Sequence, residues 1–187
     1  MKEDIKKAIE VLHAGGVILY PTDTIWGLGC DATNAGAVKR IYEIKRREDS
    51  KSMLVLTDSI AKVQSHTDEV PDVAFDLLEA ADKPLTIIYP KGRNLAENLM
   101  AEDGSIGMRI TSEAFSKALC EHFRKPIVST SANISGEPSP QCFAEISEEI
   151  RQAVDYIVEF RQNDQTKATP SSIILIGKGG EVKIIRA

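Results

Sequence analysis

Hydroxyl, carboxylate and indole groups are concentrated in residues 20–29, directly after the apolar run of residues 17–19. Pro21 has no amide hydrogen and favours extended geometry in the residue before it, so the expected strand ends there. Two threonines, an aspartate and the only tryptophan then fall in a non-helical segment, where Gly27 and Gly29 permit close backbone approach. The pattern favours a hydroxyl-lined loop at the end of a core strand, a common place for small-molecule sites. The structural alternative is a turn whose polar groups satisfy only their own backbone.

Cationic side chains gather where a helix is expected to end. Lys45 and Arg47, with Lys51 shortly after, could converge on a polyphosphate and orient it. Interaction with the helix dipole and with water would also account for such a run. Arg109 lies inside the otherwise apolar residues 106–110, and a buried arginine needs a partner. Either a carboxylate or phosphate ligand or a structural acid would serve.

The densest polar cluster follows the apolar residues 126–128 and consists of Ser129, Thr130, Ser131, Asn133, Ser135 and Ser139. Hydroxyl and carboxamide groups after a strand suit hydrogen bonding to a phosphate or a nucleobase without a nucleophile. Turn and N-cap chemistry is the alternative.

Other nucleotide and hydrolase motifs are absent or poorly placed. Gly27-x-Gly29-x-x-Ala32 has the spacing of a dinucleotide fingerprint, but that motif needs its glycines in the tight turn immediately after a strand. The sequence contains neither a P-loop nor a G-x-S-x-G elbow. The three histidines are isolated, so none is favoured as a metal ligand or a base.

Composition is that of an ordinary globular protein: 187 residues, 42% hydrophobic and 27% charged. The net charge of −5 argues against a broadly cationic nucleic-acid binder. Apolar runs are too short for a transmembrane helix, and the N-terminus does not resemble a signal peptide, so no membrane association is expected. Three widely spaced cysteines favour neither a disulfide framework nor a zinc site, and a reducing cytoplasm is the expected location.

Apolar periodicity predicts alternating helices and strands. Helices are expected at residues 3–14, about 34–47 and 70–81, from a start within 111–114, and at 142–153. Strands are expected at residues 17–19, 53–56, 85–89, 106–110, 126–128, 156–158, 172–176 and 182–185, the last two joined as a hairpin. Residues 91–104 are expected to form a loop or short helix. This order predicts one α/β domain over residues 1–187, with a mixed parallel and antiparallel sheet flanked by helices.

Taken together, these stretches resemble the threonylcarbamoyl-AMP synthase family, the YrdC/Sua5 proteins. Residues 20–28 are similar to the family's YPT(D/E)TxYGL signature, with Trp26 at the usual tyrosine. Further motifs match in order along nearly the whole chain: KxR at 45–47, PLT at 84–86, (V/M)R at 108–109, SANxSGxPS at 131–139, (E)ST(V/I)(V/I) at 170–174 and a near-terminal arginine at Arg186. The chain departs from the pattern at four positions, Glu48, Ser52, Leu56 and Thr111. It also stops at Ala187, so the resemblance is to a divergent member of the short type.

The resemblance implies a twisted sheet with a large concave basic groove. It also implies the synthesis of threonylcarbamoyl-AMP from L-threonine, bicarbonate and ATP, with release of pyrophosphate. That product would serve a threonylcarbamoyl transferase complex that modifies tRNAs reading codons beginning with A.

Residue roles follow from motif position within this resemblance. Thr24, Arg109 and Ser129 would bind L-threonine, with Arg109 on its carboxylate. The expected ATP contacts are Arg47, Lys51, Ser105, Ser131, Ser139, Ser172 and Arg186. Lys45, Arg47 and Lys51 would be catalytic by stabilising charge in the phosphorus transition state. Thr22 and Asn133 would shape loops, and Mg²⁺ would be carried by ATP, since no carboxylate cage is visible.

Two alternatives remain open at this point. The first is a non-catalytic module that binds double-stranded RNA or tRNA through the same groove, and it would show a steep salt dependence. The second is a carbamoyl-adenylate-forming relative from hydrogenase maturation, in which the domain belongs to a much longer chain. Dependence of ATP consumption on threonine would separate that relative from the synthase.

Overall fold

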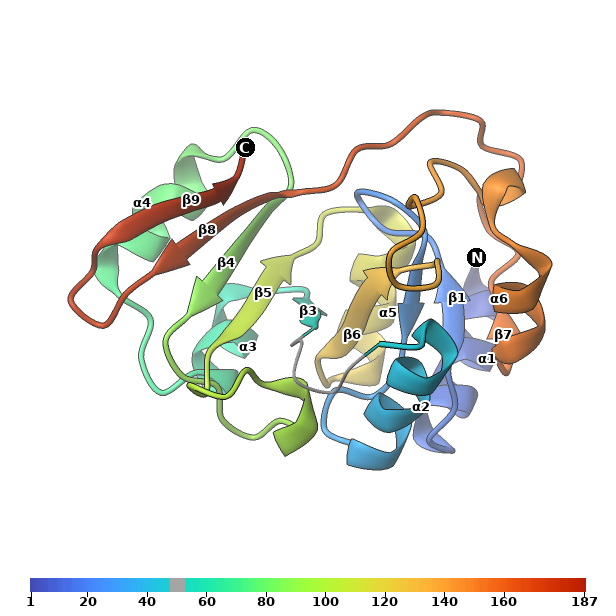
Figure 1. Cartoon of the computed structure of the whole chain (residues 1–187), viewed down its shortest axis with the longest axis horizontal. Coiled ribbons are helices and arrows are strands. Elements are labelled where there is room, and N and C mark those ends of the chain that lie inside the picture. Colours follow the sequence, from blue (N-terminus) through green and yellow to red (C-terminus); the bar gives the residue numbers. More distant parts are fainter. Residues whose placement is uncertain (48–52) are drawn as a thin grey trace.

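The structure is a computed structural model that describes residues 1–47 and 53–187 (Figure 1). In these residues, nine strands form one mixed sheet in the order β7-β1-β2-β6-β3-β5-β4-β8-β9. The strands are β1 (Ile18–Tyr20), β2 (Gly27–Gly29), β3 (Leu54–Thr57), β4 (Leu85–Tyr89), β5 (Ile106–Ile110), β6 (Ile127–Ser131), β7 (Tyr156–Ile157), β8 (Ser172–Ile176) and β9 (Val182–Arg186). The mixed α/β class predicted from the sequence is confirmed.

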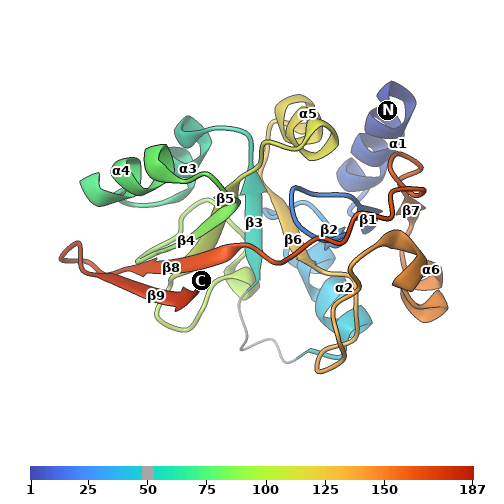
Figure 2. The ribbon, with the colours of Figure 1, turned by 90° about the horizontal axis from the view of Figure 1, so that it is seen from above.

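Helices cover both faces of the sheet. They are α1 (Lys2–His13), α2 (Ala35–Lys45), α3 (Ile60–His66), α4 (Asp72–Ala80), α5 (Ala114–Phe123) and α6 (Glu148–Ala153), with short 3-10 turns η1 (Glu97–Leu99) and η2 (Phe143–Glu145). Figure 2 shows α1, α3, α4 and α5 on one side of the sheet and α2 and α6 on the other. None of the helices in the described part of the chain combines the length and apolarity that crossing a bilayer requires.

Most elements follow the apolar pattern, and three depart from it. Strands β4, β5 and β8 have the bounds that the sequence predicts. The single helix expected at 142–153 is instead η2 followed by α6, because the Ser147 hydroxyl accepts from the Ile150 amide and starts a new helix. Helix α3 was not anticipated. Strand β2 lies in a stretch expected to be loop, so Gly27 and Gly29 belong to a strand and the dinucleotide fingerprint does not apply.

Strand β6 joins the two parts of the sheet, pairing with β2 through Thr130 and Ser131 and with β3 through residues 127–129. Both pairings are antiparallel, whereas β3 and β5 run parallel. The end of β6 therefore lies between the β1–β2 hairpin and the β3–β5–β4 strands. Its hydroxyl-bearing residues are held at the middle of the sheet by main-chain hydrogen bonds on both sides.

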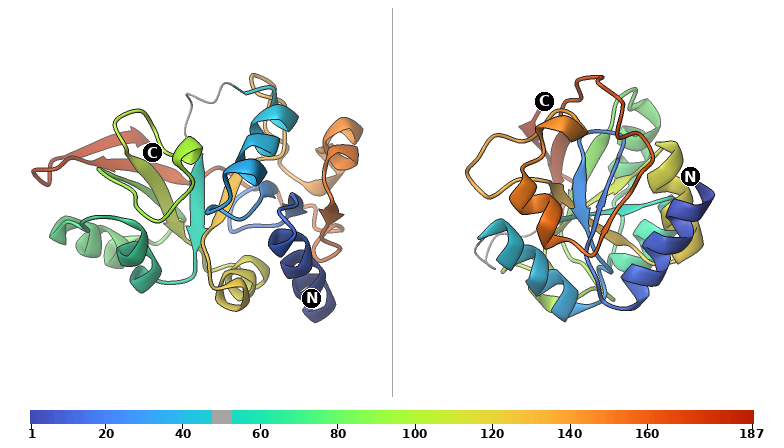
Figure 3. Two further views of the ribbon diagram at one scale, coloured as in Figure 1. Left: turned by 90° about the horizontal axis from the view of Figure 1, so that it is seen from below. Right: turned by 90° about the vertical axis from the view of Figure 1, so that its right-hand side faces the viewer.

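Residues 158–171, named the connector below, link β7 to β8. These two strands lie near opposite ends of the sheet (Figure 3). The connector consequently crosses the molecule beside the loop that joins β1 to β2 (Figure 1). Its last residues, Pro170 and Ser171, line the pocket described below, next to the point where β8 begins parallel to β4.

The departures from the family motifs have separate structural outcomes. Thr111 replaces a proline, and its amide donates to the carbonyl oxygen of Thr57 at 2.9 Å, a bond that proline could not make. Its hydroxyl also pairs with that of Ser116 at 2.8 Å. Leu56 is fully buried in β3 and belongs to the core. Glu48 and Ser52 lie outside the described residues.

Candidate active site

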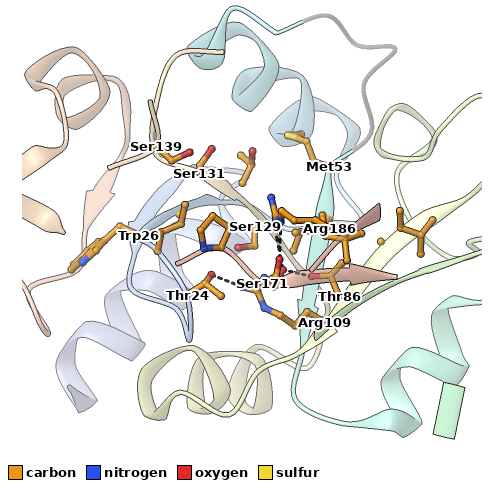
Figure 4. A pocket seen from close by; sticks show the side chains of 18 of the residues that line it. Thr24, Trp26, Met53, Thr86, Arg109, Ser129, Ser131, Ser139, Ser171 and Arg186 are labelled. Atoms are coloured by element: carbon orange, nitrogen blue, oxygen red, sulfur yellow. Dashed lines mark hydrogen bonds between the residues drawn. The ribbon is translucent and has the colours of Figure 1, made fainter. Parts of the chain in front are cut away.

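A pocket of about 350 Å³ opens where the β1–β2 loop, β4, β5, β6 and β8 meet (Figure 4). Its lining combines cationic, hydroxyl-bearing and apolar side chains from segments far apart in the sequence. The polar and charged lining residues are Thr24, Arg47, Thr86, Ser105, Arg109, Ser129, Thr130, Ser131, Ser139, Ser171 and Arg186. No carboxylate is among the described lining residues, so the pocket suits an anionic ligand.

Arg109 of β5 is 3% exposed and belongs to the pocket wall. Its Nη2 lies 3.0 Å from Oδ1 of Asp23 and donates to the Thr24 hydroxyl at 3.1 Å. Its Nε is buried and has no hydrogen-bond partner among the described residues. Asp23 is therefore the structural acid that the sequence suggested as one partner of Arg109. The Nε of Arg109 is the donor that could still serve a ligand.

Asp23 itself is a buried carboxylate that the sequence analysis assigned no role. Burial raises the pKa of its carboxyl above the ordinary value, and the charge of Arg109 opposes that rise without cancelling it. The negative charge of Glu113 adds to the rise. The charges of Asp23 and Arg109 thus depend on one another, because both side chains are buried.

Thr22 and Thr24 of the β1–β2 loop have different structural roles. The Thr22 hydroxyl accepts from the Thr24 amide at 3.1 Å and donates to the Ile25 carbonyl oxygen at 2.8 Å. The Thr22 and Thr24 hydroxyls also pair at 3.1 Å. Thr24 is one of the pocket-lining residues and Thr22 is not. Thr22 therefore holds the turn that presents the Thr24 hydroxyl.

Glycines in β2 allow the close packing on which the Ser129 hydroxyl depends. A Cβ at Gly27 would lie 3.3 Å from Ser129 Oγ, and one at Gly29 would lie 2.5 Å from Cε1 of Tyr20. Tyr20 passes under this strand and donates its hydroxyl to the Val128 carbonyl oxygen at 3.1 Å. Bulkier residues in β2 would displace Tyr20 or crowd Ser129, so these glycines act by close approach.

Trp26, where the family motif has tyrosine, forms one wall of the pocket and is 5% exposed. Its ring packs against the Phe143 ring with centroids 4.8 Å apart, and the Arg151 guanidinium lies over the Phe143 ring, 4.6 Å from its centroid. These contacts hold the Trp26 ring in place in the pocket wall. Because Trp26 is the single tryptophan of the chain, its fluorescence reports on the pocket.

Lys45 occupies a different place from the one expected of a phosphate ligand. Its side chain is 2% exposed, and its ammonium donates to the carbonyl oxygens of Ser131 and Asn133 at 2.5 and 2.7 Å. Burial and the nearby charge of Arg47 lower the pKa of Lys45 to about 8. Lys45 is not among the pocket-lining residues, whereas Arg47 is. Lys51 lies outside the described residues.

The loop after β6 is held from within. The side-chain Nδ2 of Asn133 donates to the carbonyl oxygens of Ile134 and Glu137 at 3.2 and 2.7 Å. This closes the turn between Ser131 and Ser139, and both of these serines line the pocket. The geometry gives Asn133 a loop-shaping position, as expected from its motif.

Arg186, at the end of β9, is held by Ser171, the residue that precedes β8. Its Nε donates to the Ser171 carbonyl oxygen at 2.8 Å, and the Ser171 hydroxyl pairs with that of Thr86 at 2.8 Å. Burial and the positive charge of Arg109 lower the pKa of Arg186. Ser171 lines the pocket, and its neighbour Ser172 does not. Sequence reasoning missed Ser171 and Thr86, although both lie in motifs that it quoted.

Metal binding by the protein alone is poorly supported. Across residues 1–47 and 53–187, no group of three or more histidine, cysteine, aspartate or glutamate side chains is arranged to hold an ion. The pocket instead presents three arginines, Arg47, Arg109 and Arg186.

Comparison with known proteins identifies relatives along nearly the whole chain. The family model for Sua5, YciO and YrdC proteins, described as "Telomere recombination", matches residues 10–187. The threonylcarbamoyl-AMP synthase of Pseudoalteromonas translucida (strain TAC 125) is 34% identical over 172 residues, which cover 90% of this chain and 91% of the relative. A protein of the same name from Xanthomonas euvesicatoria pv. vesicatoria (strain 85-10) is 34% identical over 159 residues, covering 83% and 85%.

Solved structures agree in fold. The crystal structure of P. abyssi Sua5 complexed with L-threonine superposes with a TM-score of 0.86 at 26% identity, covering 97% of this chain and 53% of that one. This chain therefore spans about half of the P. abyssi protein. E. coli YciO gives a TM-score of 0.86 at 26% identity, covering 100% of this chain and 89% of YciO.

Proposed function

Since the chain belongs to the Sua5, YciO and YrdC family, we propose that it is a threonylcarbamoyl-AMP synthase. This nucleotidyltransferase would convert L-threonine, bicarbonate and ATP into threonylcarbamoyl-AMP, pyrophosphate and water. The observation that carries the proposal is the position of Arg109 in the pocket wall, with a buried Nε that has no hydrogen-bond partner among the described residues. An arginine so placed suits an amino-acid carboxylate. The structural relative complexed with L-threonine supports the same substrate.

The pocket divides into two regions that fit the two larger substrates. Thr24, Arg109 and Ser129 lie together and would take the carboxylate and hydroxyl of threonine. We assign the phosphates and nucleoside of ATP to other residues of the pocket lining, Arg47, Ser131, Ser139, Ser105 and Arg186. In this assignment Arg47 and Arg186 supply positive charge for the triphosphate, while Arg109 serves the threonine carboxylate.

Chemistry in this pocket needs no enzyme nucleophile. The neutral amine of threonine attacks the carbon of bicarbonate. The bond from that carbon to the bicarbonate hydroxyl breaks, and the hydroxyl leaves as water with one proton from the amine, which gives the carbamate anion. A carbamate oxygen then attacks the α-phosphorus of ATP, and the bond to pyrophosphate breaks. Holding the reactants in line can lower the barrier by about 7 kcal/mol or more. Arginines aimed at the phosphates would stabilise the charge that develops in the transition state.

Further parts of the proposal rest on this activity. Mg²⁺ would accompany ATP on its phosphates, because the described lining offers no carboxylate. The product would pass to a threonylcarbamoyl transferase complex that modifies tRNA reading codons beginning with A, in the cytoplasm. Direct contact with tRNA is not needed for the reaction itself.

The test is pyrophosphate release from ATP by the purified chain, with L-threonine and bicarbonate added together and each omitted. We expect release only when both are present, and chromatography should show a nucleotide product containing threonine. L-Valine, which has the shape of threonine without its hydroxyl, is the matched substrate control. Release that ignores threonine, or RNA binding without any turnover, would overturn the proposal. The latter result would favour the RNA-binding alternative.

A further inference from the structure

Arg161, at the start of the connector, ties three separate segments together behind the β1–β2 loop. Its Nη1 donates to the carbonyl oxygen of Thr22 at 3.2 Å and lies 3.4 Å from Oε1 of Glu113. Its Nε and Nη2 both donate to one carboxylate oxygen of Asp164, at 3.2 and 3.0 Å. The side chain is 31% exposed, so most of it is enclosed by these contacts.

Glu113 links Arg161 to the core. Its Oε2 accepts from the amide and hydroxyl of Ser116, both at 2.8 Å, and so caps the start of α5. Its other oxygen, Oε1, is buried and has no hydrogen-bond partner among the described residues. The Glu113 side chain is 9% exposed, and Arg161 is the cation paired with it. Without that cation, a buried negative charge would be left close to Asp23.

Five charged side chains follow one another from the connector to the pocket: Asp164, Arg161, Glu113, Asp23 and Arg109, with the two acids Glu113 and Asp23 next to each other. Arg161 balances Glu113, and Arg109 balances Asp23. Loss of Arg161 would leave three acids of this series, Asp164, Glu113 and Asp23, with Arg109 as their one cation. Asp23 would then hold a proton more readily, and its hold on Arg109 would weaken.

The backbone of Arg161 indicates that its position is enforced. Its φ is +68°, in the left-handed region that costs a non-glycine residue about 1–2 kcal/mol. Arg124 has a similar φ of +64°, but it is the exposed C-cap of α5, where left-handed geometry is the ordinary way to end a helix. Arg161 caps no helix, and contacts with three segments hold it in place.

We propose that Arg161 is a positioning residue for the threonine end of the pocket, and this inference rests on the proposed function. By holding the Thr22 carbonyl and the Glu113 carboxylate, it fixes the turn that presents Thr24 and offsets the negative charge beside the Asp23–Arg109 ion pair. It does not line the main pocket and touches no reacting atom. Its effect should therefore fall on threonine and leave the ATP region unchanged.

The experiment measures threonine binding from Trp26 fluorescence and the KM values for threonine and ATP from pyrophosphate release. Arg161→Met removes the guanidinium and keeps an unbranched side chain of similar backbone cost. Arg161→Lys keeps the charge, but its single ammonium cannot serve all three segments. Arg124→Met is the matched control, the same change at another arginine of positive φ.

We expect Arg161→Met to raise the Kd and KM for threonine at least tenfold and the KM for ATP less than twofold. Arg161→Lys should raise the threonine values about threefold, and Arg124→Met should leave all of them unchanged. If Arg161→Met does not fold, Arg161→Lys decides the question. A wild-type Kd for threonine in a folded Arg161 variant, or an equal loss for ATP, overturns the inference. If the unmodified chain and Arg124→Met both fail to bind threonine, the proposed function itself fails.

Discussion

Replacing Arg109 by methionine would separate substrate recognition from stability at the centre of the pocket. The guanidinium forms a buried ion pair with Asp23 and donates to Thr24. Methionine fills similar space without charge or donors. The change therefore removes both the counter-ion of Asp23 and the group proposed to bind the threonine carboxylate.

The two losses have different magnitudes. Removing one member of a buried ion pair costs about 3–5 kcal/mol, because the remaining charge is stranded. In a chain of this size each kcal/mol lowers Tm by about 2–4 °C, so a fall of roughly 10 °C is expected. The pKa of Asp23, already raised by burial, would rise further, and protonation would limit the loss. A hydrogen bond to a charged group contributes about 1.5–3 kcal/mol, so the threonine KM should rise at least tenfold.

The assay combines thermal melting with steady-state kinetics in a double-mutant cycle. Arg109→Met is compared with Asp23→Asn/Arg109→Met, in which both charges are gone. The double variant should recover most of the lost stability, because no carboxylate is left unpaired. It should not recover threonine affinity, since the ligand's own partner is still missing. The KM for ATP should change little in either variant.

Two results would refute this reasoning. A threonine KM within twofold of wild type in Arg109→Met would show that the arginine serves only Asp23. Recovery of threonine affinity in the double variant would show that the first loss came from disorder and not from a missing contact.

Two further predictions concern buried charges. Lys45→Met removes the donor to the carbonyl oxygens of Ser131 and Asn133. The KM for ATP should therefore rise about tenfold while the protein stays folded. A thousandfold fall in kcat at unchanged KM would instead support direct contact of Lys45 with phosphate. Burial opposes ionisation of Asp4, but hydrogen bonds from the Glu159 amide and the Tyr156 hydroxyl, with the nearby N-terminal charge, lower the pKa of Asp4. This stabilisation is present above the ordinary value of 3.8 and is lost as pH falls through the folded pKa. Asp4→Asn should therefore lower the free energy of unfolding by about 1–2 kcal/mol at pH 7 in denaturant titrations. This difference from the unmodified chain should shrink toward pH ~3. A difference that is the same at both pH values would show that ionisation of Asp4 is irrelevant.

The sequence by itself determined the class of fold and the two polar segments of the site. Runs such as residues 85–89, 106–110 and 172–176 are rich in branched apolar residues and are bounded by proline or polar residues, so their strand character is local. An arginine inside such a run already required an acid or an anionic ligand. The sequence also placed serines and threonines directly after a buried apolar run, although the structure includes Ser129, Thr130 and Ser131 in β6 itself.

Only the tertiary structure decided which of these groups meet. Strand β2 has little strand preference of its own and exists because β1 and β6 pair with it on both sides. Lys45 has the sequence signature of a phosphate ligand, yet the chain brings the carbonyls of Ser131 and Asn133 to its ammonium. Asp23 lies 86 residues from Arg109 and Thr22 lies 139 residues from Arg161, and no local pattern marks either contact. Local propensity depends on neighbours along the chain, whereas the pairing of buried charges depends on burial, which the complete fold creates.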